Sequence, residues 1–252
     1  MITSFSIADA SLAQLALVCV AAFGAAIVGG LSGFGTGLIL PVVVAPLVGV
    51  ANVIPVMAVG MTLNNLSRVA AFRHDIAWPH VRRLLRLGLP LCIVGAYSYT
   101  LLSARWIGIL LGGFLIASVP VRRVLARLEY RLAGKGETTA GAGFGFIDGA
   151  MTGTGAILIS ILMAAGVSGP ALIATDAIVS AVMGAAKIVV FGGFAKLDLQ
   201  LVLIGTLIGV CTAPGAFVAR RLLDRIPARI HAGIMELVVL GGGVMFLWRA
   251  LR

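Results

Sequence analysis

Long apolar runs separated by short polar segments make up most of the chain. A helix that crosses a bilayer needs about 17–25 predominantly apolar residues, and five runs clearly qualify. These runs are 12–29, 51–72, 170–192, 199–219 and 232–248. Two shorter runs, 87–103 and 106–120, are usable as spans. The pattern predicts an all-α, polytopic integral membrane protein.

The two halves of the chain resemble each other at an offset of about 120 positions. Residues 32–39 (Ser-Gly-Phe-Gly-Thr-Gly-Leu-Ile) resemble residues 152–159 (Thr-Gly-Thr-Gly-Ala-Ile-Leu-Ile). Residues 68–72 (Arg-Val-Ala-Ala-Phe) likewise match residues 187–191 (Lys-Ile-Val-Val-Phe). The repetition predicts that two related transmembrane repeats form one membrane domain.

Basic residues between the runs predict which loops are cytoplasmic. Thirteen of the 19 Lys and Arg residues lie in the segments 73–86, 121–137 and 220–231. Because Lys and Arg collect in cytoplasmic loops, these segments are predicted to be cytoplasmic. The segment 193–198 holds only one Lys and one Asp and is predicted to be external.

These loop assignments place the two repeats in opposite orientations. The loop after the Arg68 run is predicted inside, whereas the loop after the Lys187 run is predicted outside. We therefore expect an inverted repeat that consists of residues 1–137 and residues 138–252. Inverted repeats are typical of transporters, and the binding site lies near the midplane where the repeats meet. The two arginines near the C-terminus, at positions 249 and 252, fit this topology less well.

Glycine-rich stretches interrupt both repeats at equivalent places. Residues 30–37 read Gly-Leu-Ser-Gly-Phe-Gly-Thr-Gly, and residues 149–155 read Gly-Ala-Met-Thr-Gly-Thr-Gly between the half-length runs 140–150 and 156–166. Irregular backbone at membrane depth is tolerated only where protein or a watery cavity covers it. A helix that restarts after such a break presents free N–H groups, which bind anions. We predict two broken, re-entrant helices that meet at one anion site at the midplane; close helix packing is the alternative.

Arg68 and Lys187 occupy equivalent places in the two repeats. A charge at bilayer mid-depth costs about 3 kcal/mol on insertion scales, so a functional role is expected. The two bases would attract an anion from opposite sides, with Asn64 and Asn65 about one helical turn before Arg68. Each base also lies about one turn from the end of its run, so snorkelling to the membrane surface is the alternative.

Three acidic residues, Asp148, Asp176 and Glu236, lie in apolar surroundings. Intramembrane carboxylates often relay protons, so Asp148 and Asp176 are candidates for proton coupling. Asp176 lies about three turns before Lys187, too far for direct contact. Its counterpart in the first repeat is near Met57, so we expect it outside the symmetric part of the site. For both carboxylates the alternative is a hydrogen-bonded structural acid near a helix end.

Composition and charge exclude several other classes of protein. Of the 252 residues, 60% are apolar and 11% are charged, and the mean hydropathy is +1.12. A soluble domain is about half apolar and one quarter charged, so soluble, disordered and secreted proteins are excluded. The net charge of +10 fits membrane loops better than nucleic acid, because no aromatic RNA-binding pattern accompanies it.

Cysteine usage and the N-terminal segment add two further expectations. The cysteines Cys19, Cys92 and Cys211 lie within apolar runs and have no metal-ligand spacing, so no metal and no cofactor is expected. The apolar stretch from Leu12 is preceded by no basic segment, which makes it a poor secretory signal peptide. We expect it to remain in the mature protein.

A protease is the alternative outside transport. Residues 30–33 (Gly-Leu-Ser-Gly) fit the short Gly-x-Ser pattern of intramembrane rhomboid-type serine proteases, with Ser32 as nucleophile. That chemistry needs a His base within reach, and the histidines, all in or beside basic loops, are His74, His80 and His231. The second repeat has Thr152 at the equivalent position, which binding or packing explains better. We expect no catalytic residue, and the lack of a P-loop motif excludes ATP-driven pumping within this chain.

The chain resembles the TauE/SafE family of membrane proteins, the sulfite exporter group. The resemblance rests on residues 29–41 (Gly-Gly-Leu-Ser-Gly-Phe-Gly-Thr-Gly-Leu-Ile-Leu-Pro), their weaker second copy and the helix spacing along nearly the whole chain. It implies about eight transmembrane helices in two related halves, and export of sulfite or small organosulfonates such as sulfoacetate across the bacterial inner membrane. The family's motif falls on Gly30, Ser32, Gly33, Gly35 and Gly37, and in the second copy on Thr152, Gly153 and Gly155.

These observations predict a multi-pass secondary transporter that exports a small oxyanion, sulfite or an organosulfonate, across the bacterial inner membrane by alternating access. The candidate substrate-binding residues are Ser32, Gly33, Phe34, Gly35, Thr36, Gly37, Asn64, Asn65, Arg68, Thr152, Gly153, Thr154, Gly155, Ala156 and Lys187. The expected partners are the small anion and the lipid bilayer, with a homodimer as an option. A permease for another small anion or carboxylate is the alternative within transport.

Overall fold

The computed structural model describes residues 12–32, 36–125, 131–222, 240–248 and 250–251, and within these ranges it is helical without strands. Its elements are α1 (Leu12–Ser32), α2 (Thr36–Val48), η2 (Val50–Asn52), α3 (Val53–Phe72), η3 (Arg73–Asp75), α4 (Trp78–Thr100), α5 (Ala104–Leu125), α6 (Lys135–Ala150), α7 (Gly155–Ala164), α8 (Gly169–Gly193) and α9 (Leu199–Leu222). Residues 240–248 are also helical. The prediction of an all-helical, polytopic protein is confirmed.

Three segments of the described chain are long and apolar enough to cross a membrane. They are Val50–Asp75, Ala104–Val121 and Gly169–Gly193. The apolar helices Ala13–Ile27, Thr36–Val48, Gly155–Ala164 and Leu199–Gly215 are shorter. The predicted run 232–248 lies mostly outside the described residues, and only its end is seen as helix. The number of membrane crossings therefore stays a prediction.

The basic segment 73–86 is not a loop over its whole length. α4 begins at Trp78, so the arginines at positions 82, 83 and 86 lie on its first turns. Arg82 and Arg86 are exposed, whereas Val81 and Leu84 on the same turns are buried. This alternation gives an amphipathic helix start, which the average hydropathy of the segment conceals. The helix is therefore longer than the apolar run 87–103 predicted.

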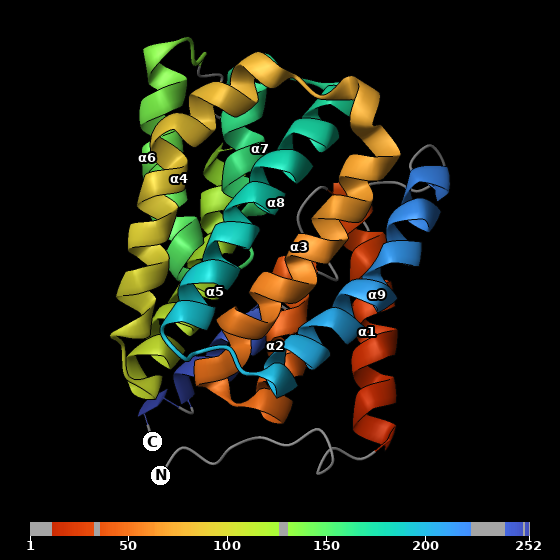
Figure 1. Cartoon of the computed structure of the whole chain (residues 1–252), viewed down its shortest axis with the longest axis vertical. Coiled ribbons are helices and arrows are strands. Elements are labelled where there is room, and N and C mark those ends of the chain that lie inside the picture. The colour runs from red at the N-terminus through yellow and green to blue at the C-terminus, as the bar shows by residue number, and fades with distance from the viewer. Residues whose placement is uncertain (1–11, 33–35, 126–130, 223–239, 249, 252) are drawn as a thin grey trace.

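Helices from the two halves of the chain pack against each other in reciprocal pairs. α1 packs along α9, and α6 packs along α4, while α3 and α8 meet between them. Figure 1 shows α1 rising from the lower end of the molecule and α6 descending from the upper end. The reciprocal pairing agrees with two related halves in opposite orientations, and the repeat itself stays a prediction.

Helix ends that carry the basic segments lie toward one end of the molecule. The beginning of α4, the end of α5 and the end of α9 all lie toward the upper end in Figure 1. The connection from α8 to α9, residues 194–198, lies at the opposite end. This separation is the one that the distribution of Lys and Arg predicted, and it supports a cytoplasmic upper end.

Glycines form the contact between α4 and α6. A methyl group at Gly141 would lie 2.6 Å from the Leu84 carbonyl oxygen, and one at Gly145 or Gly149 would overlap the α4 backbone at Gly88 or Cys92. Small residues let membrane helices approach until their backbones touch. These α6 glycines therefore serve close helix packing, and of them only Gly149 belongs to the glycine-rich stretch 149–155 for which packing was the alternative.

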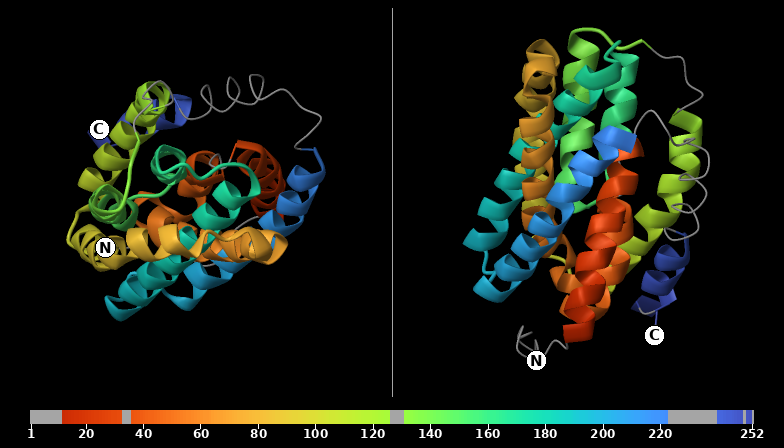
Figure 2. Two further views of the ribbon diagram at one scale, coloured as in Figure 1. Left: turned by 90° about the horizontal axis from the view of Figure 1, so that it is seen from above. Right: turned by 90° about the vertical axis from the view of Figure 1, so that its right-hand side faces the viewer.

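α5 stands at one flank of the molecule, beside the helical residues 240–248 (Figure 2). Gly112 approaches the carbonyl of Gly243 and the side chain of Leu247 in this contact. The face of α5 turned toward α6 and α7 lines an apolar groove. The polar centre of the protein is formed instead by α3, α8 and the two helix breaks.

Candidate functional site

The two helix breaks meet backbone to backbone. α2 begins at Thr36 and α7 at Gly155, each just after a break. A methyl group at Gly37 would lie 2.9 Å from the backbone N and Cα atoms of Gly153, so these two glycines approach as closely as their backbones allow. The equivalent glycine-rich stretches of the two halves thus come together at one place, as the sequence predicted.

The second break depends on one glycine in a left-handed conformation. α6 ends at Ala150, Met151 is extended, and Gly153 has φ 82°. A side chain at Gly153 would also meet the Leu38 side chain and the carbonyl oxygen of Gly37. Only glycine allows this backbone conformation and this approach together without strain. The break ends at Thr154, whose carbonyl accepts hydrogen bonds from the first turn of α7.

The structure describes the residues on either side of the first break, up to Ser32 and from Thr36 onward. The predicted residues Gly33, Phe34 and Gly35 lie outside the described residues, and Ser32 is the last residue of α1. The Thr36 hydroxyl donates a hydrogen bond to the Ala25 carbonyl at 3.0 Å, which ties the start of α2 to α1. Pro41 lies one turn into α2 and has no N–H, so it offers no helical donor to the Gly37 carbonyl.

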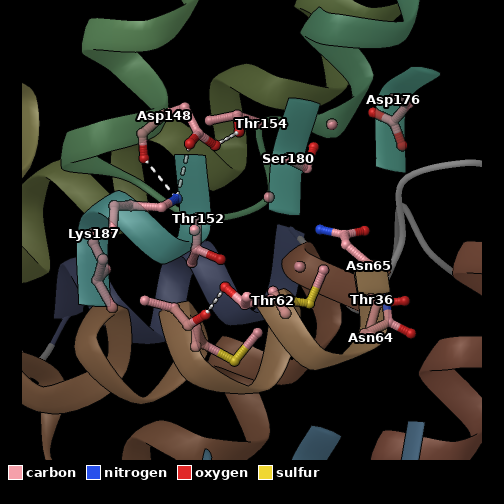
Figure 3. A pocket seen from close by; sticks show the side chains of 18 of the residues that line it. Thr36, Thr62, Asn64, Asn65, Asp148, Thr152, Thr154, Asp176, Ser180 and Lys187 are labelled. Atoms are coloured by element: carbon pink, nitrogen blue, oxygen red, sulfur yellow. Dashed lines mark hydrogen bonds and ion pairs between the residues drawn. The ribbon is translucent and has the colours of Figure 1, made fainter. Parts of the chain in front are cut away.

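A small polar cavity lies where the two breaks meet α3 and α8 (Figure 3). Its volume is about 60 Å³, room for roughly four waters at about 10–15 Å³ each. The lining residues are Ala26, Thr36, Gly37, Ile54, Met57, Ala58, Met61, Thr62, Asn64, Asn65, Arg68, Asp148, Thr152, Gly153, Thr154, Gly155, Asp176, Ser180, Gly184 and Lys187. The cavity is therefore the size of one compact ion and is rich in hydroxyl, amide and charged groups.

Arg68 forms a buried ion pair with Asp176 across the α3–α8 contact. Its Nη1 atom lies 2.9 Å from Asp176 Oδ2 and 3.2 Å from Asn65 Oδ1. Arg68 is 6% exposed and Asp176 is 1% exposed. Sequence comparison of the repeats placed Asp176 outside the symmetric part of the site, and the structure shows that it nevertheless lines the cavity and pairs with Arg68. The pair joins unlike positions of the two halves, which a comparison of like positions does not reveal.

The remaining donors of Arg68 have no partner within the described chain. Its Nε and Nη2 atoms are buried and unbonded, and so is the Oδ1 atom of Asp176. Nε and Nη2 form the edge of the guanidinium that binds two oxygens of a carboxylate, phosphate or similar oxyanion side by side. A buried polar group without a partner costs about 1–3 kcal/mol. Arg68 therefore presents an unused oxyanion fork in the cavity.

Lys187 makes a different arrangement with Asp148. Its Nζ atom lies 2.9 Å from Asp148 Oδ2 and also donates to the Asp148 backbone carbonyl at 3.0 Å. The Thr154 hydroxyl donates to the other carboxylate oxygen of Asp148 (Figure 3). Asp148 lies in the last turn of α6, where carbonyls lack helical donors and a cation is favourable. The bond from Thr154 to Asp148 thus ties the two sides of the second break together, and Lys187 fixes Asp148 from α8.

Charges in the cavity balance in the structure. Arg68 and Lys187 face Asp176 and Asp148, so the four groups sum to zero if all are ionised. Neither base extends to the molecular surface, since Arg68 is 6% and Lys187 8% exposed. The structure therefore shows the cavity-facing arrangement and not snorkelling. The excess of positive charge expected from the two bases alone is cancelled by two acids of the second half.

Most of the predicted binding residues that the structure describes line this one cavity. These are Thr36, Gly37, Asn64, Asn65, Arg68, Thr152, Gly153, Thr154, Gly155 and Lys187, together with the acids Asp148 and Asp176. Ala156 instead lines the apolar groove beside α5. Sequence reasoning missed Thr62 and the methionines Met57 and Met61. All three lie on the stripe of α3 that leads to Arg68, so helical periodicity could have found them.

The described histidines lie away from the cavity lining. His74 is exposed, and His80 is bonded through Nδ1 to Glu137 Oε2 at 2.8 Å. Glu137 is buried in the first turn of α6 and also accepts a hydrogen bond from Arg83 at 2.9 Å. This cluster fastens the start of α6 to α4. His231 and the side chain of Ser32 lie outside what the structure describes.

Apolar helices around a small, charge-balanced cavity at two helix breaks define a class of polytopic membrane proteins that carry small solutes. The sequence model of the family described as "Sulfite exporter TauE/SafE" matches residues 18–246 of the chain. The protein belongs to this family, which is a family of membrane transporters. The match confirms the resemblance seen in the sequence. Comparison with curated proteins and with solved structures gives no match.

Proposed function

We propose that the protein is a secondary transporter that exports a small oxyanion across the bacterial inner membrane, with sulfite or an organosulfonate such as sulfoacetate as its substrate. One observation carries the proposal. Arg68 lines the polar cavity between the helix breaks, and its Nε and Nη2 atoms are buried without a partner among the described residues. An oxyanion with two oxygens on one face satisfies both donors at once.

The size of the cavity favours a compact head group. A volume of about 60 Å³ corresponds to roughly four waters, which suits sulfite or the sulfonate group of a larger molecule. The hydroxyls of Thr152 and Ser180 and the amides of Asn64 and Asn65 surround this space. The first N–H groups of α7, at Gly155 and Ala156, have no helical acceptors and add donors beside it. An organic tail requires that the cavity open to one side.

Alternating access follows from the way the breaks meet. α2 and the break before α7 belong to different halves and meet at Gly37 and Gly153, so rocking of one half against the other would open the cavity on opposite sides in turn. The membrane potential or protons drive the movement. An anion that leaves a cell with a negative interior gains about 2.3 kcal/mol per charge per 100 mV. Asp148 and Asp176 are the candidate proton carriers.

The experiment is uptake of labelled sulfite into proteoliposomes by wild type, Arg68→Lys and Arg86→Lys. Arg68→Lys keeps the positive charge but removes the fork, so uptake at low sulfite is expected to fall at least tenfold. Arg86 is an exposed arginine of α4, so Arg86→Lys serves as the matched control and is expected to transport normally. No sulfite uptake by wild type would overturn the substrate, and normal uptake by Arg68→Lys would overturn the binding geometry.

A permease for small carboxylates is the second candidate, because a guanidinium fork binds carboxylate as well as sulfonate. Competition separates the two substrates in the same proteoliposomes. Inhibition of sulfite uptake by excess methanesulfonate but not by excess acetate favours the sulfur oxyanion. The reverse order of inhibition favours the carboxylate permease.

A further inference from the structure

We propose that Asp176 carries one proton with each monovalent anion, so that the loaded transporter moves no net charge. This inference rests on the proposed function and names the ion that accompanies the substrate. Export is then driven by the anion's own concentration gradient, against the inward proton gradient and independently of the membrane potential. It is carried by the contrast between the two buried acids of the cavity and by the charge balance among the four ionisable groups that line it.

The two carboxylates differ in how their oxygens are bonded. Asp148 uses both, since Oδ2 accepts from Lys187 and Oδ1 accepts from the Thr154 hydroxyl. Asp176 uses only Oδ2, which faces Arg68 Nη1 at 2.9 Å, and its Oδ1 is buried without a partner among the described residues. A proton on Asp148 would compete with the donors that both of its oxygens already accept. A proton on Asp176 Oδ1 displaces nothing and supplies a donor where an anion binds.

Charge balance requires such a proton when an anion enters. The empty cavity holds two bases and two acids, so a monovalent anion adds one uncompensated negative charge. A buried charge that is not paired is strongly unfavourable. One proton taken up with the anion restores neutrality. The empty cavity is also neutral, so the transporter can return without substrate and without moving charge.

Asp176 is the group that can accept this proton. The charged and titratable groups around it on the described helices are Arg68 on α3, Cys92 on α4, Asp148 on α6 and Lys187 on α8 itself. Those of η3, which also packs on α8, are exposed: Arg73, His74 and Asp75. Arg68 and Lys187 are donors in the ion pairs. The Cys92 thiol donates toward Asp148 and Met183, and both oxygens of Asp148 already accept hydrogen bonds.

One transport cycle then balances as follows. On the loading side water gives a proton to Asp176 Oδ1, and the anion binds Arg68 through Nε and Nη2. The new O–H of Asp176 donates to an oxygen of the anion. On the opposite side the anion leaves, the proton returns to water, and the Arg68–Asp176 ion pair forms again. No bond other than the O–H bond is made or broken.

The test measures the equilibrium distribution of labelled methanesulfonate in proteoliposomes, because this anion keeps a single negative charge across the neutral pH range. Valinomycin and potassium gradients set the membrane potential, and buffers set the pH on each side. For the wild type, the inside-to-outside ratio is expected to rise tenfold for each unit by which the inside is more alkaline. A potential of 100 mV is expected to leave this ratio unchanged.

Asp176→Asn replaces the carboxylate by an amide that imitates the protonated acid. If this variant folds and transports, its ratio is expected to ignore the pH difference and to shift about fifty-fold per 100 mV, as for an uncoupled monovalent anion. Asp148→Asn is the matched control, and it is expected to transport more slowly but to keep the response to pH. The wild-type measurement decides the proposal even if Asp176→Asn does not fold.

Four outcomes separate this proposal from the function on which it rests. A wild-type ratio that follows the potential and not the pH difference overturns proton coupling and leaves the transporter intact. Coupling that persists in Asp176→Asn and disappears in Asp148→Asn overturns the assignment to Asp176. Uptake of labelled sulfite without uptake of methanesulfonate overturns the proposed binding of the anion by Arg68 beside a protonated Asp176. Uptake of neither anion overturns the proposed function itself.

Discussion

The two buried ion pairs of the cavity use the same kinds of charge in different ways. Lys187 and Asp148 lie 39 positions apart in the second half, and Lys187 binds both the carboxylate and the backbone carbonyl of Asp148. Arg68 and Asp176 lie 108 positions apart, on helices of different halves. The first pair closes a helix break with its hydrogen bonds. The second pair leaves donors and an acceptor unused.

This difference separates a structural pair from a binding pair. Atoms that are already bonded hold the break between α6 and α7 in place, and they have few hydrogen-bonding positions free for a ligand. Atoms that are buried and unbonded raise the free energy of the empty state, which a ligand can lower. The contrast predicts that variants of the two pairs have different effects on transport, even where their effects on stability are alike.

The largest effect is expected for Arg68→Gln. It removes two charge-assisted hydrogen bonds to the anion, so transport at low substrate should fall at least about a hundredfold. It also leaves Asp176 buried without its partner, which should lower the free energy of unfolding by about 3–5 kcal/mol. Uptake assays and thermal unfolding in detergent measure the two effects.

The double variant Arg68→Gln/Asp176→Asn is the control for stability. It contains no unpaired charge, so thermal unfolding should return close to that of the wild type while transport stays lost. Recovery of transport in the double variant would contradict a binding role for Arg68. It would show that Arg68 serves only to neutralise Asp176.

Lys187→Met should lower stability about as much as Arg68→Gln but should affect transport less. We expect a similar loss of stability, about 3 kcal/mol, because Asp148 loses its cation. We expect a smaller effect on transport, about tenfold, since the fork of Arg68 remains. Lys187→Met/Asp148→Asn should recover both stability and most of the transport rate in the same assays. A loss of transport that the second substitution does not relieve would place Lys187 among the residues that bind the anion.

Gly153→Ala tests the contact between the two breaks, with Gly166→Ala as its matched control. Both glycines have positive φ, 82° and 85°, but a methyl group at Gly166 would meet nothing within 4 Å. Gly166→Ala should therefore show the backbone cost alone, about 1–2 kcal/mol. Gly153→Ala should be less stable than this control and slower in transport. Equal thermal stability of the two variants would contradict the close approach of Gly153 to α2.

The smallest effect is expected for Arg83→Gln at the edge of the helix bundle. The Arg83 side chain is 44% exposed, and its partner Glu137 keeps a second bond to His80. Loss of such an exposed ion pair costs at most about 1 kcal/mol. Thermal unfolding should change little and sulfite uptake should stay normal. A large loss of uptake would mean that charge outside the cavity matters as much as charge within it.

Much of the fold follows from the apolar pattern, and its failures have a physical cause. The runs behind α3 and α8 are long and apolar, so their position was predicted closely. The first turns of α4 were assigned to a loop because three arginines lower the average hydropathy. There the helix buries Val81 and Leu84 on one face and exposes charge on the other. The mean hydropathy of a segment does not reveal such an amphipathic start of a helix.

The candidate site was predictable in its members but not in its pairings. Repetition of the sequence identified both glycine-rich stretches and both bases, because equivalent positions have the same local pattern. The partner of Arg68 depends on how α3 packs against α8, and no local pattern contains that information. The counterpart of Asp176 in the first half is near Met57 and is not acidic, so the symmetry that identified Arg68 did not point to its partner.

The glycine contact between α4 and α6 has a consequence for how this protein can change over generations. Its members are Gly88, Gly95, Gly141, Gly145 and Gly149. At each of them a single added methyl group meets backbone atoms, so even the mildest replacement is opposed by both helices. A library of random variants selected for function should retain glycine at these positions. It should diversify freely at Gly143, which lies about half a turn from Gly141 and Gly145 and where an added methyl group meets nothing within 4 Å. The amino-acid sequence at the contact between α4 and α6 would thus change more slowly than that of the rest of the molecule.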